Sequence, residues 1–386
     1  MNVRPLRNAA VGLAAAVLAL AATASPAVAD PNPATDFRTL ALTGSDTTQD
    51  LGNALGETVR IGGNKVIASW DARPPAGGST RITTKATGCA GTAGGGFVRP
   101  NGSGNGRLSL RASLNQDIGQ GGAGIWQGDS IVGCVDAARS SAYSSTTPGT
   151  SGALTYIPIG VDAVSPAINT NSDFPRNNSF ARIQRVYKCF DNNITGLPAQ
   201  PVIPQAGSGT RSFWLQQMEI TEQEITLGDL PCLTVVAFPQ EHDGTVLDGH
   251  PERIVPFSAA QYIAQTNSAL IASEIPGLTV TDRRSQAILT GMNRVGQPVQ
   301  QPVVGGVLNP NYPLNRDVYH VVPTANLADA TIDAVFTGTD SLACTVTVNV
   351  GGSPRKVTEV LGFGTRSATT DLFHQVCGTV DLKANT

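Results

Sequence analysis

The sequence is poor in charged and aromatic side chains. Asp, Glu, Lys and Arg make up 14% of its 386 residues, and Phe, Trp and Tyr make up 5%. Lys and Arg form no cluster and the formal net charge is −3, so the chain lacks the basic surface that nucleic-acid binding requires. Beyond the N-terminal region, no apolar run approaches the ~20 residues of a membrane-spanning helix. These absences exclude nucleic acid as a partner and a membrane span in the main part of the chain.

Signals for catalysis and for metal binding are also scarce. The sequence has no HExxH and no CxxC motif, and its four histidines do not stand beside an obvious nucleophile. In Gly102–Gly106 the serine stands one position too early for a G-x-S-x-G nucleophile elbow. The Glu241-His242-Asp243-Gly244 run is equally typical of a polar loop. We therefore expect no enzyme activity, no catalytic residue, no metal site and no cofactor.

The N-terminus has the three parts of a secretory signal peptide. Arg4 and Arg7 are basic, residues 9–22 are apolar, and Ala27-Val28-Ala29 has the small side chains that signal peptidase accepts. The apolar run is too short to span a bilayer comfortably. We predict a signal peptide over residues 1–29, cleaved near Ala29, and a secreted or extracytoplasmic mature chain. No cysteine follows the apolar run, so no lipid anchor is evident.

An even number of cysteines in an exported chain indicates disulfide bonds. The sequence has six, which allow fifteen connectivities, and the sequence alone does not choose among them. Their spacing suggests sequential pairs. These would be Cys89–Cys134, Cys189–Cys232 and Cys344–Cys377.

The remaining composition predicts a folded α/β protein. Hydrophobic residues make up 40% of the chain, which is enough for a core, while 42 Gly and 25 Pro indicate many loops. Predicted strands alternate with predicted helices. Residues 129–134, 156–164 and 312–322 read as extended, and residues 165–180 as turns. Asp136 and Asp162 stand inside apolar runs, where each is either a buried hydrogen-bonded carboxylate or a ligand-binding group.

Three segments rich in Gly, Ser and Thr each open a predicted helix. They are residues 43–48, 101–106 and 206–211. Glycine lets backbone N–H groups turn outward, and a helix N-terminus adds free donors and positive dipole character. Such loops can hold an oxyanion without lysine. Each segment alone is equally typical of an ordinary helix cap or turn.

The order of several short motifs resembles that of type 2 periplasmic binding proteins, most of all the phosphate-binding proteins of ABC transporters. The motifs are LTGSDTTQD, NGSGNG, VDAARSSAY, YIPIGVDAV, PQAGSGTRSFW and YPLNRDVYHVV. The resemblance implies two Rossmann-like α/β lobes joined by a hinge, with a ligand between them. Lobe 1 would comprise residues 30–156 and 311–386, and lobe 2 residues 157–310. The crossings would lie near residues 156–160 and 312–315.

The resemblance also implies a set of ligand-binding residues. They are Ser45, Asp46, Thr47, Ser103, Gly104, Ser140, Ser141, Ser208, Gly209, Thr210 and Arg211. Phosphate binders carry a Ser-Asp pair where this chain has Ser140-Ser141, and an arginine where it has Pro204. Asp46 is then the candidate for the missing acceptor, and Arg211 or Arg139 for the missing charge.

We therefore expect a secreted, monomeric protein that captures phosphate or a related small oxyanion without catalysis. An ABC permease is a possible partner. One alternative is a secreted interaction protein that kept the fold and lost transport. The other is a secreted phosphatase-like hydrolase.

Overall fold

The computed structural model describes residues 30–75, 78–92, 95–191, 193–194, 197–234 and 240–386. The predicted signal peptide, residues 1–29, lies outside these ranges. Helices in the described residues are α1 (Gln49–Thr58), α2 (Ser103–Ser113), α3 (Phe180–Tyr187), α4 (Gly209–Met218), α5 (Glu222–Leu227), α6 (Ala259–Thr266), α7 (Ser268–Glu274), α8 (Ala330–Phe336), α9 (Leu342–Thr345) and α10 (Val357–Val360).

A mixed β-sheet organises the fold, which confirms the predicted α/β class. Its strands in spatial order are β14 (Gln200–Pro201), β15 (Arg253–Ser258), β10 (Leu154–Asn169), β20 (Asn315–Pro323), β9 (Ala137–Ser140), β1 (Leu40–Gly44) and β4 (Ile67–Ser69), and β16 (Ala287–Leu289) and β23 (Lys383–Ala384) also pair with β10. Strands β9, β1 and β4 are parallel to one another. Their carboxyl ends therefore meet at one edge, where the loops that follow them lie together.

Short two-stranded sheets lie outside this main sheet. They are β2 (Arg60–Ile61) with β3 (Asn64–Lys65), β5 (Arg81–Ile82) with β6 (Phe97–Val98), β7 (Ile125–Trp126) with β8 (Asp129–Ser130), β11 (Asn177–Ser179) with β17 (Gly291–Asn293), β12 (Asn193–Ile194) with β13 (Leu197–Pro198), β18 (Val303–Val304) with β19 (Val307–Leu308), and β21 (Thr347–Val350) with β22 (Ser353–Lys356).

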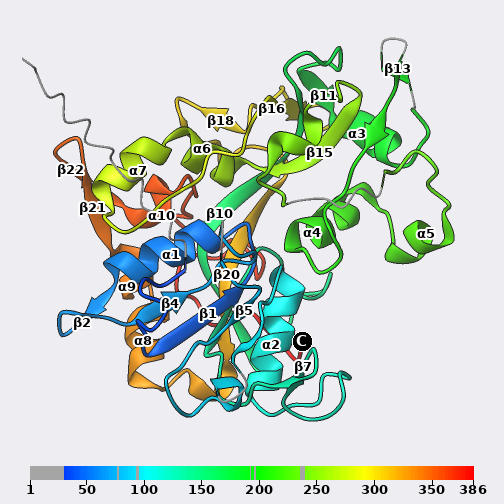
Figure 1. Ribbon diagram of the computed structural model, residues 1–386. Helices are drawn as coiled ribbons and strands as arrows, with labels where there is room; N and C mark the ends of the chain where they lie inside the picture. Colours follow the sequence, from blue (N-terminus) through cyan, green and yellow to red (C-terminus); the bar gives the residue numbers. More distant parts are fainter. Residues whose placement is uncertain (1–29, 76–77, 93–94, 192, 195–196, 235–239) are drawn as a thin grey trace, which may run out of the picture.

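Strand β10 changes partner halfway along its length. It pairs antiparallel with β20 from Leu154 to Ala163 and then with β15 from Val164 to Ile168. Figure 1 shows β10 and β20 running together through the centre of the molecule, between two groups of elements. We call these groups the β1 half (β1, β4, β9, α1, α2 and α8–α10) and the β15 half (β14–β16, α3 and α4).

Each half has its own hydrophobic core. In the β1 half, Leu51 and Leu55 of α1 pack with Leu42, and Trp126 and Tyr156 belong to a second cluster. In the β15 half, Tyr187, Trp214 and Ile254 are fully buried in a separate cluster. Helix α6, which follows β15, contributes Ala260 and Ala264 to the first cluster and Ala259 and Ile263 to the cluster of the β15 half, so it packs against both cores. The lobe boundaries at residues 156/157 and 310/311 stay predictions.

Two local expectations were wrong. Residues 165–169 continue β10 instead of turning, because pairing with β15 satisfies their backbone groups and Ser165 Oγ donates to the Thr290 carbonyl at 3.0 Å. Only Asp129–Ser130 of the predicted strand 129–134 is extended, and the parallel strand follows at Ala137–Ser140. Tertiary pairing outweighed local composition at both places.

The three disulfides pair the cysteines in sequential order. They join Cys89 to Cys134, Cys189 to Cys232, and Cys344 to Cys377. This confirms the pairing suggested by their spacing. No helix within the described ranges is long and apolar enough to cross a membrane.

Candidate functional site

The three predicted loop–helix segments meet at one place. Gly102 N–H donates to the Gly44 carbonyl at 3.2 Å, and Gly104 N–H donates to the Gly207 carbonyl at 3.0 Å. These bonds tie the N-terminus of α2 to the end of β1 and to the loop before α4. Gly102 has a φ of 98°, a conformation that glycine adopts without strain. The N-termini of α1, α2 and α4 therefore converge between the two halves.

Hydroxyl groups fill the space between these helix ends. Ser103 Oγ lies 3.2 Å from Ser141 Oγ and accepts the Ser141 backbone N–H at 2.9 Å. A methyl group added to Gly209 would collide with both hydroxyls, so the start of α4 packs directly against them. Ser103, Ser141 and Gly209 come from three distant parts of the chain, and the fold brings them into contact.

A second group of hydroxyls surrounds the carboxylate of Glu241. Thr47 Oγ1 and Ser208 Oγ donate to Glu241 Oε1 at 3.0 and 2.9 Å. Thr47 Oγ1 also lies 3.2 Å from Thr210 Oγ1, and Gln261 Nε2 donates to the Thr47 carbonyl at 2.8 Å. These bonds join the loop that follows β1 in the β1 half to the start of α4 in the β15 half, and to Glu241 and Gln261.

Asp46 lies in the same buried region. Burial first, and then the negative charge of Glu241, raise the pKa of Asp46 well above its ordinary value. Neither carboxyl oxygen of Asp46 has a hydrogen-bond partner among the described residues, and neither does Glu241 Oε2. Burial and the neighbouring Glu241 carboxylate thus both favour the protonated form of Asp46. A protonated Asp46 can donate a hydrogen bond, and Glu241 Oε2 can accept one.

The positive charge at these hydroxyls comes from Arg316 of β20. Its Nη2 donates to Thr210 Oγ1 at 2.7 Å and to Asp162 Oδ2 at 3.0 Å. The guanidinium lies over the Phe213 ring at 5.3 Å. Its Nε and Nη1 are buried without a partner among the described residues. Two N–H directions therefore remain available to an anion.

Asp162 has a positioning role. Its Oδ1 accepts the Ser258 hydroxyl at 2.9 Å and the Ala260 N–H at 3.1 Å, while Oδ2 holds Arg316. Asp136, the other carboxylate inside an apolar run, accepts the Ala41 N–H at 2.7 Å and pairs with Lys85 at 2.5 Å. Both carboxylates are thus engaged by the protein itself.

We call the converging group the cradle, and its residues come from both halves of the molecule. Its side chains are fully buried except that of Arg316, which is 5% exposed. The cradle consists of Ser45, Asp46, Thr47, Ser103, Gly104, Ser141, Ser208, Gly209, Thr210, Glu241 and Arg316. Nine of these were singled out in the sequence; Arg316 and Glu241 were not assigned a ligand-binding role there.

Arg211 faces away from the cradle. Its Nε and Nη2 bind the carboxylate of Glu222, at 2.8 and 2.5 Å, and its Nη1 donates to the Pro204 carbonyl at 2.8 Å. The expectation that Arg211 supplies the charge is therefore corrected: its fork is already filled by Glu222. Arg316, which lies in the YPLNRDVYHVV motif, is the candidate that the geometry offers instead.

Arg139 and Ser140 hydrogen-bond to backbone carbonyls next to the cradle. Arg139 is fully buried, and its guanidinium donates to the Ser45 and Leu42 carbonyls and to Ser69 Oγ. Burial lowers the pKa of Arg139 to about 10, so it stays charged at neutral pH. The Ser140 hydroxyl accepts from Arg107 Nη1 at 3.1 Å and donates to the Ala142 carbonyl at 2.6 Å. Both side chains hold the first loop and the end of β9 in place.

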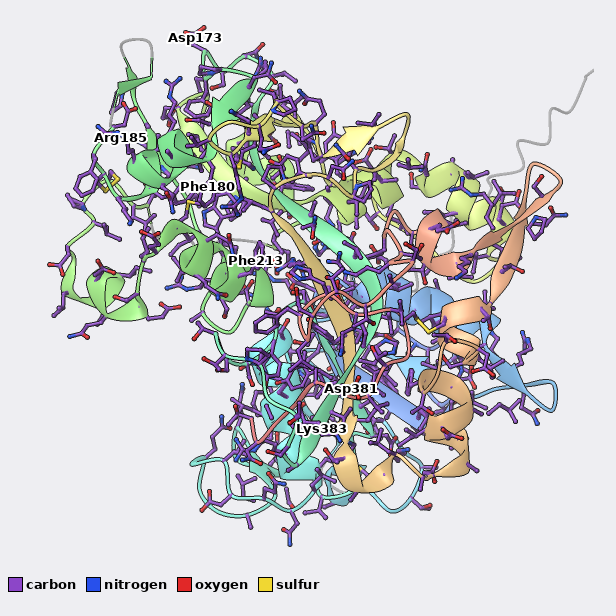
Figure 2. The ribbon with its side chains drawn as sticks, turned by 180° about the vertical axis from the view of Figure 1, so that it is seen from behind. Asp173, Phe180, Arg185, Phe213, Asp381 and Lys383 are labelled. Atoms are coloured by element: carbon purple, nitrogen blue, oxygen red, sulfur yellow. A yellow bond between two sulfur atoms is a disulfide. The ribbon has the colours of Figure 1, made fainter. Side chains whose placement is uncertain are left out.

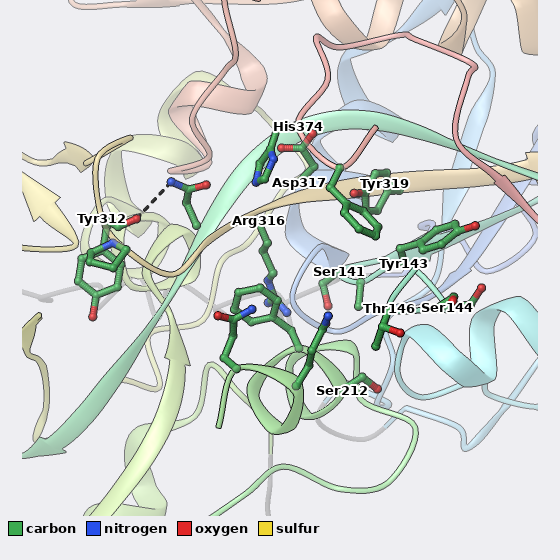
Figure 3. A pocket seen from close by; sticks show the side chains of 18 of the residues that line it. Ser141, Tyr143, Ser144, Thr146, Ser212, Tyr312, Arg316, Asp317, Tyr319 and His374 are labelled. Atoms are coloured by element: carbon green, nitrogen blue, oxygen red, sulfur yellow. Dashed lines mark hydrogen bonds between the residues drawn. The ribbon is translucent and has the colours of Figure 1, made fainter. Parts of the chain in front are cut away.

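A cavity of about 610 Å³ adjoins the cradle. Figure 3 shows Arg316 extending from its strand towards the helix that carries Ser212, with Ser141 nearby. Both Arg316 and Ser141 belong to the cradle and also line the cavity. The described residues include no group of three or more His, Cys, Asp or Glu side chains placed to hold a metal ion.

Comparison with known proteins found similarity in structure. No protein-family model and no curated protein sequence matches the chain. A putative phosphate ABC transporter substrate-binding protein with bound phosphate from Clostridium perfringens is 14% identical, with a TM-score of 0.41, over 76% of this chain and 91% of that one. A phosphate transport receptor from Vibrio cholerae is 14% identical, with a TM-score of 0.40, over 76% and 90%.

A human phosphate-binding apolipoprotein extends the match further along the chain. It is 13% identical, with a TM-score of 0.45, over 89% of this chain and 100% of that one. At this low identity, the chain is similar in structure to phosphate-binding proteins, including substrate-binding proteins of phosphate ABC transporters.

Proposed function

We propose that this chain is a secreted binding protein that captures a small oxyanion, with phosphate as the leading ligand, and performs no catalysis. The observation that carries the proposal is the cradle itself. Three helix N-termini, six buried hydroxyls and the N–H groups of Arg316 that have no partner among the described residues converge there between the two halves. Helix N-termini and hydroxyl donors favour an oxyanion, and a guanidinium adds charge in a geometry that suits it.

The unpartnered carboxyl groups support phosphate over sulfate. Monohydrogen phosphate carries a P–OH group, which can donate to Glu241 Oε2 or to an oxygen of Asp46. Sulfate at neutral pH has no such proton and cannot donate to Glu241 Oε2. A buried site built to accept a hydrogen bond rejects a ligand that lacks the donor.

Secretion fits the chemistry of the cysteines. All six are joined in disulfides, which persist in oxidising compartments. The signal peptide over residues 1–29, a monomeric state and delivery to an ABC permease belong to the same proposal.

Calorimetry tests the proposal on protein that has been unfolded, freed of ligand and refolded. We expect saturable binding of phosphate with one site per chain, and weaker binding of sulfate. Absence of both heat and thermal shift with phosphate, sulfate and arsenate would refute oxyanion binding. Turnover of a chromogenic phosphate ester would instead favour the hydrolase alternative.

A further inference from the structure

The cavity beside the cradle is much larger than an inorganic oxyanion requires. Its volume is about 610 Å³. An anion of five heavy atoms takes the space of about two or three water molecules, each roughly 30 Å³. Cavities that hold organic ligands have volumes of roughly 300–1,000 Å³. The cavity therefore has the size of an organic group and not of a single ion.

The cavity and the cradle share a wall. Ser141 contacts Ser103 in the cradle, and Arg316 contacts Thr210 there, while both residues also line the cavity. Phe213 lines the cavity and lies against the Arg316 guanidinium. Figure 2 places Phe213 near the centre of the molecule, beside the crossing strands. If Arg316 binds the phosphoryl group of a larger ligand, the atoms attached to that group would lie at the mouth of this cavity.

The lining of the cavity combines aromatic rings and uncharged hydrogen-bonding groups with the charged side chains of Arg294, Arg316 and Asp317. Rings come from Tyr143, Phe213, Tyr319 and Phe373, and hydroxyl and amide groups come from Ser144, Thr146, Ser212, Gln216 and Asn315. The one acidic side chain in the lining, Asp317, accepts from Arg366 Nε and from the Gln375 N–H, so it is already paired. Ring faces bind apolar C–H surface, while amides and hydroxyls bind hydroxyl groups.

Resting on the proposed function, we infer that the ligand is a phosphate monoester of a small polyol or sugar. The phosphoryl group would occupy the cradle, and its ester oxygen would lead past Ser141 and Arg316 into the cavity. Both halves contribute to the lining of the cavity: residues 141–146 follow β9 of the β1 half, and Ser212, Phe213, Gln216 and Gln217 belong to α4 of the β15 half. Closure would therefore enclose the organic group together with the anion.

Calorimetry with glucose 6-phosphate, inorganic phosphate and glucose tests the inference. We expect glucose 6-phosphate to bind about tenfold more tightly than phosphate, since the cavity adds contacts worth about one factor of ten.

Gln216 is exposed on α4 and lines the cavity. Q216W fills the cavity and should abolish the preference for the ester while leaving the phosphate Kd within about twofold of wild type. A269W, at an exposed position of α7 away from the cavity, is the matched control and should change neither value.

Each outcome separates the inference from the proposed function. Equal affinity for phosphate and glucose 6-phosphate, or weaker binding of the ester, overturns the inference and leaves oxyanion binding intact. A preference for the ester that survives Q216W overturns the assignment of the cavity. Binding of neither ligand overturns both proposals.

Discussion

At the scale of single residues, two buried arginines have different tasks. Arg316 Nε and Nη1 have no partner in the part of the chain that the structure describes, and Nη2 contacts the Thr210 hydroxyl of the cradle. Arg211 is only three residues from the α4 N-cap Ser208, yet it is held by Glu222 and the Pro204 carbonyl. Position in the fold, and not distance along the chain, decides which guanidinium can meet an anion.

We expect R316K to lower phosphate affinity by about tenfold or more, because lysine lacks the planar fork that can bind Thr210, Asp162 and an anion together. R211K is the matched control and should change affinity by less than about threefold. Calorimetry on ligand-free protein provides both values. Equal losses in the two variants would contradict the assignment of charge to Arg316.

His320 is a buried group whose protonation opposes folding. Neither ring nitrogen has a partner among the described residues, the ring packs on Phe336, and Arg139 lies opposite it in the sheet register. Burial, and then the charge of Arg139, lower the pKa of His320 to about 3. The unfolded chain protonates near its ordinary value of about 6.5. The free energy of unfolding therefore falls as the pH drops from about 6.5 towards 3.

We expect H320F to remove this contribution. Relative to wild type, its free energy of unfolding should rise by about 2 kcal/mol on going from pH 7.5 to pH 5, because only wild type loses stability through this group. Urea unfolding of ligand-free protein at both pH values measures the difference. H250Q, at a histidine that is only partly buried, is the control. An unchanged pH dependence in H320F would contradict this account.

At the scale of elements, the cradle depends on close packing of three helix ends. Gly209 begins α4, and its missing side chain leaves room for the Ser103 and Ser141 hydroxyls. Gly104 in α2 is less constrained, since the nearest atom to an added methyl would be the Gly207 carbonyl oxygen at 3.3 Å. Alanine substitutions at Gly209 and Gly104 therefore test, with a large and a small steric effect, how closely α4 must approach α2.

We expect G209A to lower phosphate affinity by about tenfold or more, because the methyl group forces α4 away from α2 and spreads the donors. G104A should have an effect below about threefold. Circular dichroism and thermal melting of both variants separate loss of the site from loss of the fold. A folded G209A with wild-type affinity would show that the three helix ends need not touch.

At the scale of the whole molecule, the cradle is closed. Ser45, Asp46, Thr47, Ser103, Ser141, Ser208 and Thr210 have no exposed surface, and they come from both halves. Separation of the halves, which β10 and β20 connect, would open the cradle to an anion. The change of partner at Ala163/Val164 places β10 in both halves.

We expect phosphate to slow amide hydrogen exchange in residues 45–48, 102–105 and 208–211 by about tenfold or more, because the ligand favours the closed arrangement. Amides of β1 at Leu40–Leu42, in the core of the β1 half, are the internal control and should change little. Exchange mass spectrometry measures both groups. Equal exchange with and without saturating phosphate would contradict entry by separation of the halves.

The sequence alone determined the local features. The Gly, Ser and Thr runs at residues 43–48, 101–106 and 206–211 predicted helix starts, because these residue types cap helices whatever surrounds them, and helices begin at Gln49, Ser103 and Gly209. Alternation of strands and helices predicted the α/β class, and cysteine spacing suggested the three disulfides. The prediction of the signal peptide also rests on local pattern alone.

Only the tertiary structure decided which side chains meet. Arg316 reaches Thr210 across 106 residues, and Glu241 receives the Thr47 hydroxyl across 194, so no local pattern could join them. Arg211 is adjacent to Thr210 in the sequence, but its guanidinium pairs with Glu222, which is not part of the cradle. Local propensity acts through the backbone of a few neighbouring residues. The cradle depends instead on the order of the strands in the sheet and on how the β1 half and the β15 half pack together.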